Sequence, residues 1–348
     1  MATIKDVAKL AGVGVGTASR AISGRGGVSA GAMARVQKAI QQLDFRPSNV
    51  ARALSLKSLG MLGVYVPRFE GSFYSPILQA IDRELRAVDR HMVAANGCGH
   101  GDERLKALEG VDFLMQRQCD GILVLSNELL EADLIGLYQR SHRMVLLNRH
   151  SPALGGHVFS PEHEQAGRLA AVALLSRGHR DIAVIQGPPA APDNQDRMRG
   201  FYSELARHGV QTKFQHRIDG AFSLDSGYAG AEQLLAQGDQ SYTAVFCAND
   251  DMAMGAISRF TLAGRKVPDD VSVMGYDDTA VAGYTAPALT TVRIPMDEVT
   301  TNGCRFLLNL CYGMNLPVER DFAAQVVWRG SVAPGPHTAL HLPGQLTP

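Results

Sequence analysis

The 348-residue sequence contains no run of 18 apolar residues, the length at which a stretch becomes a candidate membrane-spanning helix. Its first ten residues, MATIKDVAKL, also lack the apolar block of a secretory signal peptide. These absences argue against a helical membrane protein and predict a cytoplasmic one. Apolar residues make up 45% and charged residues 20% of the chain, as is typical of soluble proteins with two or three globular domains.

Cysteine is scarce and shows no C-x-x-C spacing, so neither a disulfide framework nor a zinc ribbon is expected. The segment GCGHG places Cys98 two residues before His100, but two potential ligands without partners make a poor metal site. We expect reduced thiols, no metal and no other cofactor. The five cysteines are Cys98, Cys119, Cys247, Cys304 and Cys311.

Acidic residues are almost absent from the N-terminal part of the chain. Residues 1–58 contain nine lysines and arginines but only Asp6 and Asp44, a surplus of seven positive charges. Because the whole chain has 34 basic and 34 acidic residues, the remainder carries seven surplus negative charges. The asymmetry predicts a polyanionic partner for the N-terminal part alone, although a solvated basic surface would give the same count.

Three short helices are predicted for residues 1–46. The segment TIKDVAKLAG has apolar residues at helical spacing, with Thr3 as N-cap and Gly12 as the residue that ends the helix. GVGTASRAIS places Val15 and Ala18 on one face of a second helix, and Ser29 caps a third in SAGAMARVQKAIQQLDF. The short, glycine-containing connection between the first two helices is typical of a helix-turn-helix motif.

The two segments that flank the main body of the chain have their own signals. Residues 47–59 are predicted to form a hinge helix and linker, because Arg46-Pro47 breaks the third helix and Ser48 can cap a short helical turn. Residues 335–348 contain three prolines and no leucine heptad, so we expect a disordered tail.

Residues 60–334 alternate apolar strands with amphipathic helices. Sustained alternation of this kind predicts parallel sheets covered by helices on both faces. A changeover near residue 160 divides the pattern into two such sheets. The strands are expected at 61–67, 91–96, 121–126, 144–149, 182–187, 244–250 and 271–278, and the helices include 75–89, 103–118, 162–178, 196–208, 226–236 and 251–264.

Three glycines at positions 12, 14 and 16 raise the alternative of a phosphate-binding loop. A dinucleotide-binding fingerprint is G-x-G-x-x-G between a strand and a helix, whereas here G-x-G-x-G follows an amphipathic helix. A P-loop is excluded because no Gly-Lys-Ser/Thr follows. The glycines therefore fit better in the turn and second helix of a DNA-binding motif than in a nucleotide-dependent enzyme.

Ordered motifs along residues 2–333 carry a resemblance to a known family. The N-terminal part holds D-V-A, A-G-V, T-x-S-R, V-S and R-P in that order. GHRDIAVIQG, ANDDMAMGA, GYDDTAVAGYTAPALTTVRIP and WRGSV continue the series. The chain resembles the lactose repressor/galactose repressor family of bacterial transcription regulators, nearest to its galactose and aryl-glucoside branches.

The resemblance implies an all-α helix-turn-helix headpiece with a hinge helix, followed by an α/β core. That core would be two-lobed and periplasmic-binding-protein-like, with two doubly wound parallel sheets and a ligand cleft at the carboxyl ends of their strands. The N-lobe would comprise about 60–160 and about 293–322, and the C-lobe about 161–292 and about 323–334. No catalytic activity is implied.

By the family pattern, the second helix reads the major groove through Val15 and Gly16, with Arg20 one turn later. The alternatives are a core role for Val15 and a surface charge at Arg20. Gly14 stands where the family usually has serine, so we expect a headpiece that is loosely ordered until it binds DNA. The other residues expected at DNA are Thr3, Thr17, Ser19, Ser29, Asn49, Arg52 and the minor-groove wedge Leu54.

The family's effector-binding positions transfer to polar and aromatic residues of the core. Arg197 would donate paired hydrogen bonds to vicinal hydroxyls, Asn249 would donate and accept, and Asp277 would accept. Capping roles for Asn249 and Asp277 and a core role for Phe222 remain as alternatives. The expected aromatic contacts are Phe222, Phe73 and Tyr74, and Arg149 is a further candidate.

The stretch SPEHEQAG departs from the family, which leaves Glu162 or His163 in place of its aspartate. The sequence thus predicts a regulator, most simply a repressor of carbohydrate-utilisation genes, that responds to a small sugar or sugar derivative. It would bind a pseudo-palindromic operator in double-stranded DNA as a homodimer. The alternative is a cytoplasmic sugar-binding protein without a regulatory role, against which the basic headpiece argues.

Overall fold

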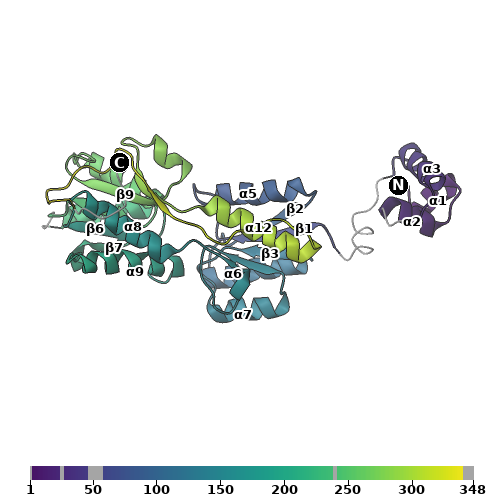
Figure 1. Ribbon diagram of the computed structural model, residues 1–348, viewed down its shortest axis with the longest axis horizontal. Coiled ribbons are helices and arrows are strands. Elements are labelled where there is room, and N and C mark those ends of the chain that lie inside the picture. The colour runs from purple at the N-terminus through teal and green to yellow at the C-terminus, as the bar shows by residue number, and fades with distance from the viewer. Residues whose placement is uncertain (1, 24–26, 46–57, 238–240, 340–348) are drawn as a thin grey trace. The chain divides into compact units, whose positions relative to one another are not determined.

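The structure is a computed structural model that describes residues 2–23, 27–45, 58–237 and 241–339. It separates into two compact units, one of Met1–Met61 with Gln118–Asp120 and the other of Leu62–Arg117 with Gly121–Pro348 (Figure 1). No helix within the described ranges is long and apolar enough to cross a membrane.

The headpiece consists of α1 (Ile4–Ala11), α2 (Val15–Ser23) and α3 (Ala30–Gln42). Thr3 caps α1 in a reciprocal capping box with Asp6, and Gly12 ends it with a left-handed φ of 62°. The three helices bury a small apolar cluster in which Val7 of α1 packs with Val36 of α3. These are the helix boundaries and caps that the amphipathic pattern indicates.

The first lobe of the core is built on a sheet with strand order β2-β1-β3-β4-β5. The pairs β1·β3, β3·β4 and β4·β5 are parallel, and the strand order is the doubly wound one. Its strands are β1 (Met61–Val66), β2 (His91–Asn96), β3 (Gly121–Val124), β4 (Met144–Leu147) and β5 (Val158–Phe159). Its helices are α5 (Tyr74–Ala87), α6 (Glu103–Gln116), α7 (Glu131–Arg140) and α12 (Met296–Tyr312).

The second lobe repeats this plan with strand order β11-β10-β9-β8-β6-β7, in which only the β10·β11 pair is antiparallel. Its strands are β6 (Ile182–Gln186), β7 (Arg217–Asp219), β8 (Ala244–Cys247), β9 (Ser272–Asp277), β10 (Thr290–Arg293) and β11 (Gln325–Val327). Its helices are α8 (His163–Ser176), α9 (Pro192–Arg207), α10 (Leu224–Ala236) and α11 (Asp250–Leu262). Short 3-10 turns occur at Gly155–His157, Phe214–His216 and Ala280–Tyr284.

The chain crosses between the lobes more than once. After β10 it returns to the first lobe, where α12 packs on α5 and on β3, β4 and β5, and β11 then rejoins the second sheet (Figure 1). Strands β5, β7 and β11 escape sequence analysis because each is only two or three residues long, and the four-residue β10 was also not predicted. The seven expected strands are all present, although several end earlier than the sequence pattern suggests.

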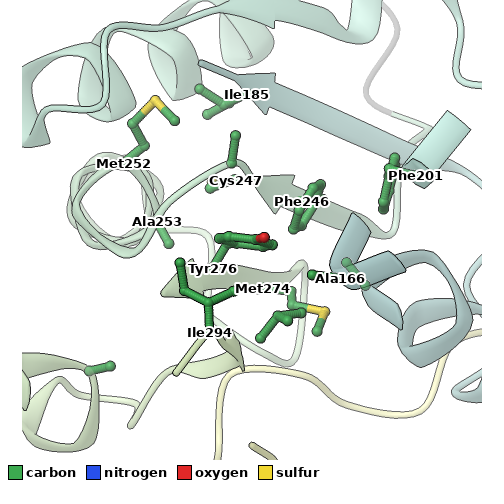
Figure 2. Close-up of a cluster of buried hydrophobic side chains, with 14 of the residues drawn as sticks. Ala166, Ile185, Phe201, Phe246, Cys247, Met252, Ala253, Met274, Tyr276 and Ile294 are labelled. Carbon is green, nitrogen blue, oxygen red and sulfur yellow. The ribbon is translucent and has the colours of Figure 1, made fainter. Parts of the chain in front are cut away.

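The interior of the second lobe contains a cluster of large aromatic side chains against its sheet. Phe201 of α9 stacks on Phe246 of β8, with ring centroids 4.4 Å apart, and Tyr276 of β9 is fully buried in the same cluster (Figure 2). Burial of such large side chains gives the second lobe a core that fixes the strand ends from which its side of the site is built.

Paired glycines allow the helices of the second lobe to pack closely. A β-carbon at Gly167 of α8 would collide with the carbonyl oxygen of Arg197, and one at Gly200 of α9 would collide with that of Glu164. Gly227 and Gly255 play the same part between α10 and α11. The position of Arg197 at the site therefore depends on the absence of a side chain from a neighbouring helix.

The expected disorder from residue 335 onward is wrong for the first part of the tail. The backbone N–H of Gly335 donates to the carbonyl of Arg177 (2.7 Å), and that of His337 donates to Gly178 (3.1 Å). Residue 178 is a glycine with φ 86°, and its lack of a side chain admits this close approach. Residues 340–348 of the expected tail lie outside the described residues.

Candidate functional site

The second helix of the headpiece presents an open face. The Val15 side chain is 45% exposed while Ala18 is fully buried, so the core role considered for Val15 is wrong and Ala18 fills that place. Arg20 is exposed, and its Nε donates to the carbonyl of Gly16 (3.3 Å). Val15 and Arg20 thus remain on a surface that can meet a base edge or a phosphate.

The unusual glycines of this motif are not required by the backbone. Neither Gly14 nor Gly16 has a positive φ, and a β-carbon at either position would meet no described atom within 4 Å. The carbonyl of Gly14 accepts from the N–H groups of Thr17 and Ala18, so Gly14 occupies the N-cap position without a side chain to cap it. The local fold would tolerate larger residues at both positions.

Other residues expected at DNA have visible local roles. The Thr3 hydroxyl donates to the Asp6 carboxylate (2.7 Å), and Ser29 caps α3 by accepting from the N–H of Ala32 (3.3 Å). Thr17 and Ser19 are half-buried on α2. The three hinge residues Asn49, Arg52 and Leu54 lie outside the described residues.

A cleft of about 540 Å³ opens at the carboxyl ends of strands from both lobes. The segments that follow β1, β2, β3 and β4 line one side, and those that follow β6, β7, β8 and β9 line the other. This is the usual place for a ligand in doubly wound folds. Six of the seven candidate effector residues line it, namely Phe73, Tyr74, Arg197, Phe222, Asn249 and Asp277.

Arg197 is the buried cation of the cleft. Its Nη1 donates to the carbonyl of Ala248 and its Nη2 lies 3.4 Å from the Asp193 carboxylate. The guanidinium carbon sits 3.8 Å from the ring centroid of Tyr276 and 5.4 Å from that of Phe222. Stacking and ion pairing together fix the guanidinium plane, which a lysine could not reproduce.

Asn249 is held more firmly than its expected role implies. Its Oδ1 caps α11 by accepting from the N–H of Met252 (2.9 Å), while its Nδ2 donates to the carbonyl of Phe222 (3.2 Å). The capping alternative therefore describes its acceptor, and one amide hydrogen is left for a ligand. By fixing the Phe222 carbonyl, Asn249 also orients an aromatic wall of the cleft.

Three residues of the cleft have a left-handed backbone. Asn148, Phe222 and Asp277 have φ values of 67°, 56° and 119°. Such conformations are unfavourable for residues other than glycine and persist where the surrounding structure imposes them, often at binding sites. Burial raises the pKa of Asp277 well above its usual range, although the nearby Arg197 acts in the opposite direction.

A buried histidine joins the two lobes behind the cleft. His163 Nε2 lies 3.1 Å from the carbonyl oxygen of Asn148, and its Nδ1 lies 2.9 Å from the Tyr276 hydroxyl. Because a carbonyl can only accept, Nε2 carries the proton and Nδ1 accepts from Tyr276. Burial and the charge of Arg197 lower the pKa of His163 to about 3, so the ring is neutral.

Comparison with known proteins places these features in a family. Residues 3–48 match the family described as bacterial regulatory proteins of the lacI family, and residues 171–332 match the periplasmic binding protein-like domain. The chain is 32% identical to the transcriptional regulator AscG of Escherichia coli over 95% of this chain and 98% of that protein. The chain belongs to the LacI family of bacterial transcription regulators.

Solved structures agree with this LacI-family assignment. A LacI-family regulator from Burkholderia phymatum is 48% identical, with a TM-score of 0.75 over 79% of this chain and 99% of that one. The lac repressor dimer bound to operator and the anti-inducer ONPF is 26% identical, with a TM-score of 0.83 over 95% of this chain and 99% of that one. This chain therefore combines a DNA-binding headpiece and a ligand-binding core in a family of regulators rather than enzymes.

Two candidate positions of this LacI-family chain differ from expectation. Arg149 does not line the cleft, because it is buried and its Nη1 donates to the carbonyls of Ser126 and Leu129. It braces the loop after β3 instead. Of the two substitutes in SPEHEQAG, Glu162 has a largely exposed side chain and His163 is the buried bridge.

Sequence reasoning missed several polar residues of the cleft. Asp193 is buried beside Arg197, and burial raises its pKa even though Arg197 lowers it. Asn127 and Asn148 follow β3 and β4, and Ser72 donates across the cleft to the Asp251 carboxylate (2.7 Å). The detectable signal was that polar residues directly follow buried apolar strands.

Proposed function

We propose that this protein is a repressor of carbohydrate-utilisation genes whose affinity for its operator changes when a small sugar or sugar derivative binds in the cleft. The observation that supports this best is the combination, in one chain, of an open recognition helix and a cleft with polar floor and aromatic walls. Arg197 and Asp277 would contact ligand hydroxyls, while Phe222, Phe73 and Tyr74 would pack on its apolar faces.

Effector binding would act on the relative position of the lobes. The hydrogen bond from Ser72 to Asp251 and the bridge through His163 both join one lobe to the other, so a ligand between them changes the balance of open and closed forms. That change would alter how readily the hinge around Leu54 orders on DNA. The coupling must be reciprocal, because an effector that weakens operator binding is itself bound more weakly on the operator.

We further propose a homodimer on a pseudo-palindromic operator. The second lobe has an apolar surface at the end of α11, where Leu262 is 71% exposed and Tyr284 is 89% exposed. Met254, Ile257 and Thr285 border a shallow hollow in the same surface. A second copy of the chain would cover it, and two headpieces would supply the affinity that one small module lacks.

DNA binding without any effector gives the primary test. Double-stranded sequences selected from a random library should bind the full chain, with affinity that falls steeply as salt rises because each phosphate contact releases counterions. Arg20→Gln should lose about 1–3 kcal/mol if Arg20 reads a base, or reduce the salt slope by about one contact if it holds a phosphate. Binding that shows no preference over random DNA would favour the sugar-binding protein without a regulatory role.

Sedimentation provides the test of the dimer. The full chain should sediment as a dimer, and Tyr284→Asp should give a monomer because it buries a charge in the proposed contact. Asp269→Asn, on an exposed loop of the same lobe, serves as the control for an altered surface charge. A Tyr284→Asp variant that remains dimeric would place the contact elsewhere.

A further inference from the structure

The chain at the end of the predicted linker is held by one buried carboxylate. Asp120 is 8% exposed and accepts hydrogen bonds from four consecutive residues. Its Oδ2 accepts from the Ser58 hydroxyl (2.7 Å) and from the N–H groups of Gly60 (2.8 Å) and Met61 (3.3 Å). Its Oδ1 accepts from the N–H of Leu59 (3.2 Å). One side chain thus fixes the backbone from residue 58 to residue 61.

The backbone of residues 58–61, which we call the linker anchor, is shaped to receive an anion. Gly60 has a left-handed φ of 68°, which glycine adopts without strain. The N–H groups of three successive residues converge on one carboxylate, and such a concave run of N–H groups favours a negative charge. The Ser58 hydroxyl supports the turn by accepting from the N–H of Gly60 (3.2 Å). The linker anchor and Asp120 are therefore complementary in shape and charge.

The hydrogen bonds of the linker anchor require a carboxylate. An ionised carboxylate is an acceptor only and carries about four lone-pair sites, which suits the donors that face Asp120. An asparagine has the same shape, but it would keep one acceptor oxygen and turn an N–H donor group toward other donors. Hydrogen bonds to an ionised group are also about twice as strong as those between neutral groups. Asparagine at position 120 would therefore hold the linker anchor poorly.

The linker anchor lies at the start of two strands that lead to the cleft. β1 begins at Met61, and β3 begins directly after Asp120, whose N–H donates to the Met61 carbonyl (2.8 Å). The two strands pair in parallel from these ends. The segments that follow them supply Arg68, Leu125 and Asn127 to the lining of the cleft. Because paired strands act as a rigid element, a shift at their cleft ends is carried to the linker anchor.

We propose that Asp120 is a positioning residue that fixes the end of the linker to the first sheet, so that movements of the lobes around the cleft reach the headpiece. This inference rests on the proposed function as an effector-responsive dimer on a two-part operator, and it assigns the coupling to one carboxylate. If Asp120 released the linker anchor, residues 58–60 would join the linker and lengthen it by about 10 Å, at about 3.3 Å per residue.

The linker anchor has a measurable consequence for DNA recognition that requires no effector. In a dimer on a two-part operator, the second headpiece binds at a high effective concentration only where the linkers span the two half-sites. Linkers of fixed length and attachment make that spacing strict. Linkers that each gain about 10 Å reach half-sites at other separations. Loss of the linker anchor should therefore relax the preference for one operator length.

Competition binding of the full chain to two DNAs measures this preference. One DNA is a duplex selected from a random library, and the other is the same duplex with two base pairs inserted at its centre, which shifts one half-site by about 7 Å along the axis. We expect the wild type to bind the lengthened DNA about 100-fold more weakly, because only one headpiece can engage it. For Asp120→Asn this ratio of affinities should be about tenfold smaller.

The ratio separates loss of the linker anchor from a general loss of stability. A less stable lobe lowers the fraction of folded protein, which weakens binding to both DNAs equally and leaves their ratio unchanged. Asp112→Asn removes the same charge from an exposed ion pair with Arg140 (2.7 Å) and should keep the wild-type ratio. Ser58→Ala removes one donor from the linker anchor and should reduce the ratio about threefold, so it serves as the test if Asp120→Asn does not fold.

The inference and the proposed function fail in different ways. A wild-type ratio in Asp120→Asn, or in Ser58→Ala if the first variant does not fold, would overturn the role of Asp120 and leave an operator-binding regulator in place. A wild type that selects DNA but binds the lengthened duplex equally well would also overturn it, because no spacing is then fixed. A wild type that selects no DNA would overturn the proposed function itself, and the role of Asp120 falls with it.

Discussion

The neutral state of His163 leads to a prediction about stability and pH. Its ordinary pKa of 6.5 falls to about 3 in the folded chain, because the ring is buried between Asn148 and Tyr276. Below about pH 6.5 the unfolded chain therefore binds a proton that the folded chain does not. The stability that His163 contributes is present above its unfolded pKa and is lost as the pH falls toward the folded value.

The size of the effect follows from linkage. Between about pH 7.5 and about pH 5.5, protonation of the unfolded chain at this one site lowers the free energy of unfolding by about 1.4 kcal/mol. The folded pKa lies so far below this range that it does not alter the result. Other titrating groups, including His179 and Asp250, also make the free energy of unfolding depend on pH. Their contribution has to be subtracted by comparison with a variant that lacks His163.

His163→Gln provides that comparison. Glutamine can donate to the Asn148 carbonyl and accept from Tyr276 without titrating, so the other groups act equally in both proteins. The assay is equilibrium urea unfolding at the two pH values, followed by the fluorescence of Trp328, the only tryptophan, whose neighbour β11 belongs to the second sheet. His100→Gln, an exposed substitution, is the control.

We expect the wild type and His100→Gln to lose about 1.4 kcal/mol more than His163→Gln on acidification. An equal loss in all three proteins would refute the buried neutral histidine. If His163→Gln is too unstable to unfold reversibly, the imidazole nitrogen chemical shifts of His163 in the wild type serve as the readout instead. A protonated ring at pH 5.5 in the folded wild type would refute the reasoning equally.

Three further predictions concern the headpiece and the second lobe. The double variant Gly14→Ser, Gly16→Ala should bind selected DNA about fivefold more tightly, because it restores about 1 kcal/mol of helix propensity at positions where an added β-carbon meets no other described atom within 4 Å. Fluorescence anisotropy titration measures this affinity. Weaker binding would mean that the backbone itself approaches DNA at these glycines. Gly167→Ala should destabilise the second lobe by about 1–3 kcal/mol in urea, because the new methyl group collides with α9, whereas Gly136→Ala in open space on α7 should not destabilise it. Arg197→Met should lower stability by about 3–5 kcal/mol because it leaves Asp193 buried and unpaired, and Asp193→Asn in the same chain should recover much of that loss; additive losses would argue against the ion pair.

Several features of the structure could be predicted from the sequence because each depends on residues that are close together in the chain. The Thr3 cap, the left-handed Gly12 and the seven expected strands follow from hydrogen-bonding groups and apolar spacing within a few residues. The candidate cleft residues came instead from the family resemblance, which transfers an arrangement that spacing alone does not reveal. Six of those seven line the cleft, although the role of each in binding stays a prediction.

The failures share a different cause. Arg149 follows a buried strand as Asn148 does, yet its side chain turns toward the carbonyls of the β3 loop, and only the packing of that loop decides the direction. For Asn249 the sequence left a ligand contact and a helix cap open, and only the structure shows that α11 and the Phe222 carbonyl occupy most of its hydrogen-bonding capacity. Strands of two or three residues carry too little pattern to detect and exist because a neighbouring strand pairs with them.

Sequence by itself determined the basic headpiece, the alternation of strands and helices, and the family, because charge, periodicity and ordered motifs are properties of the linear chain. Tertiary structure alone decided which groups meet at the cleft and in what state. His163 becomes a neutral bridge, and the pKa of Asp277 is raised, only when segments far apart in the chain are brought together, as His163 and Tyr276 are at a separation of 113 residues. Burial and neighbouring charge set these properties, and both depend on the fold.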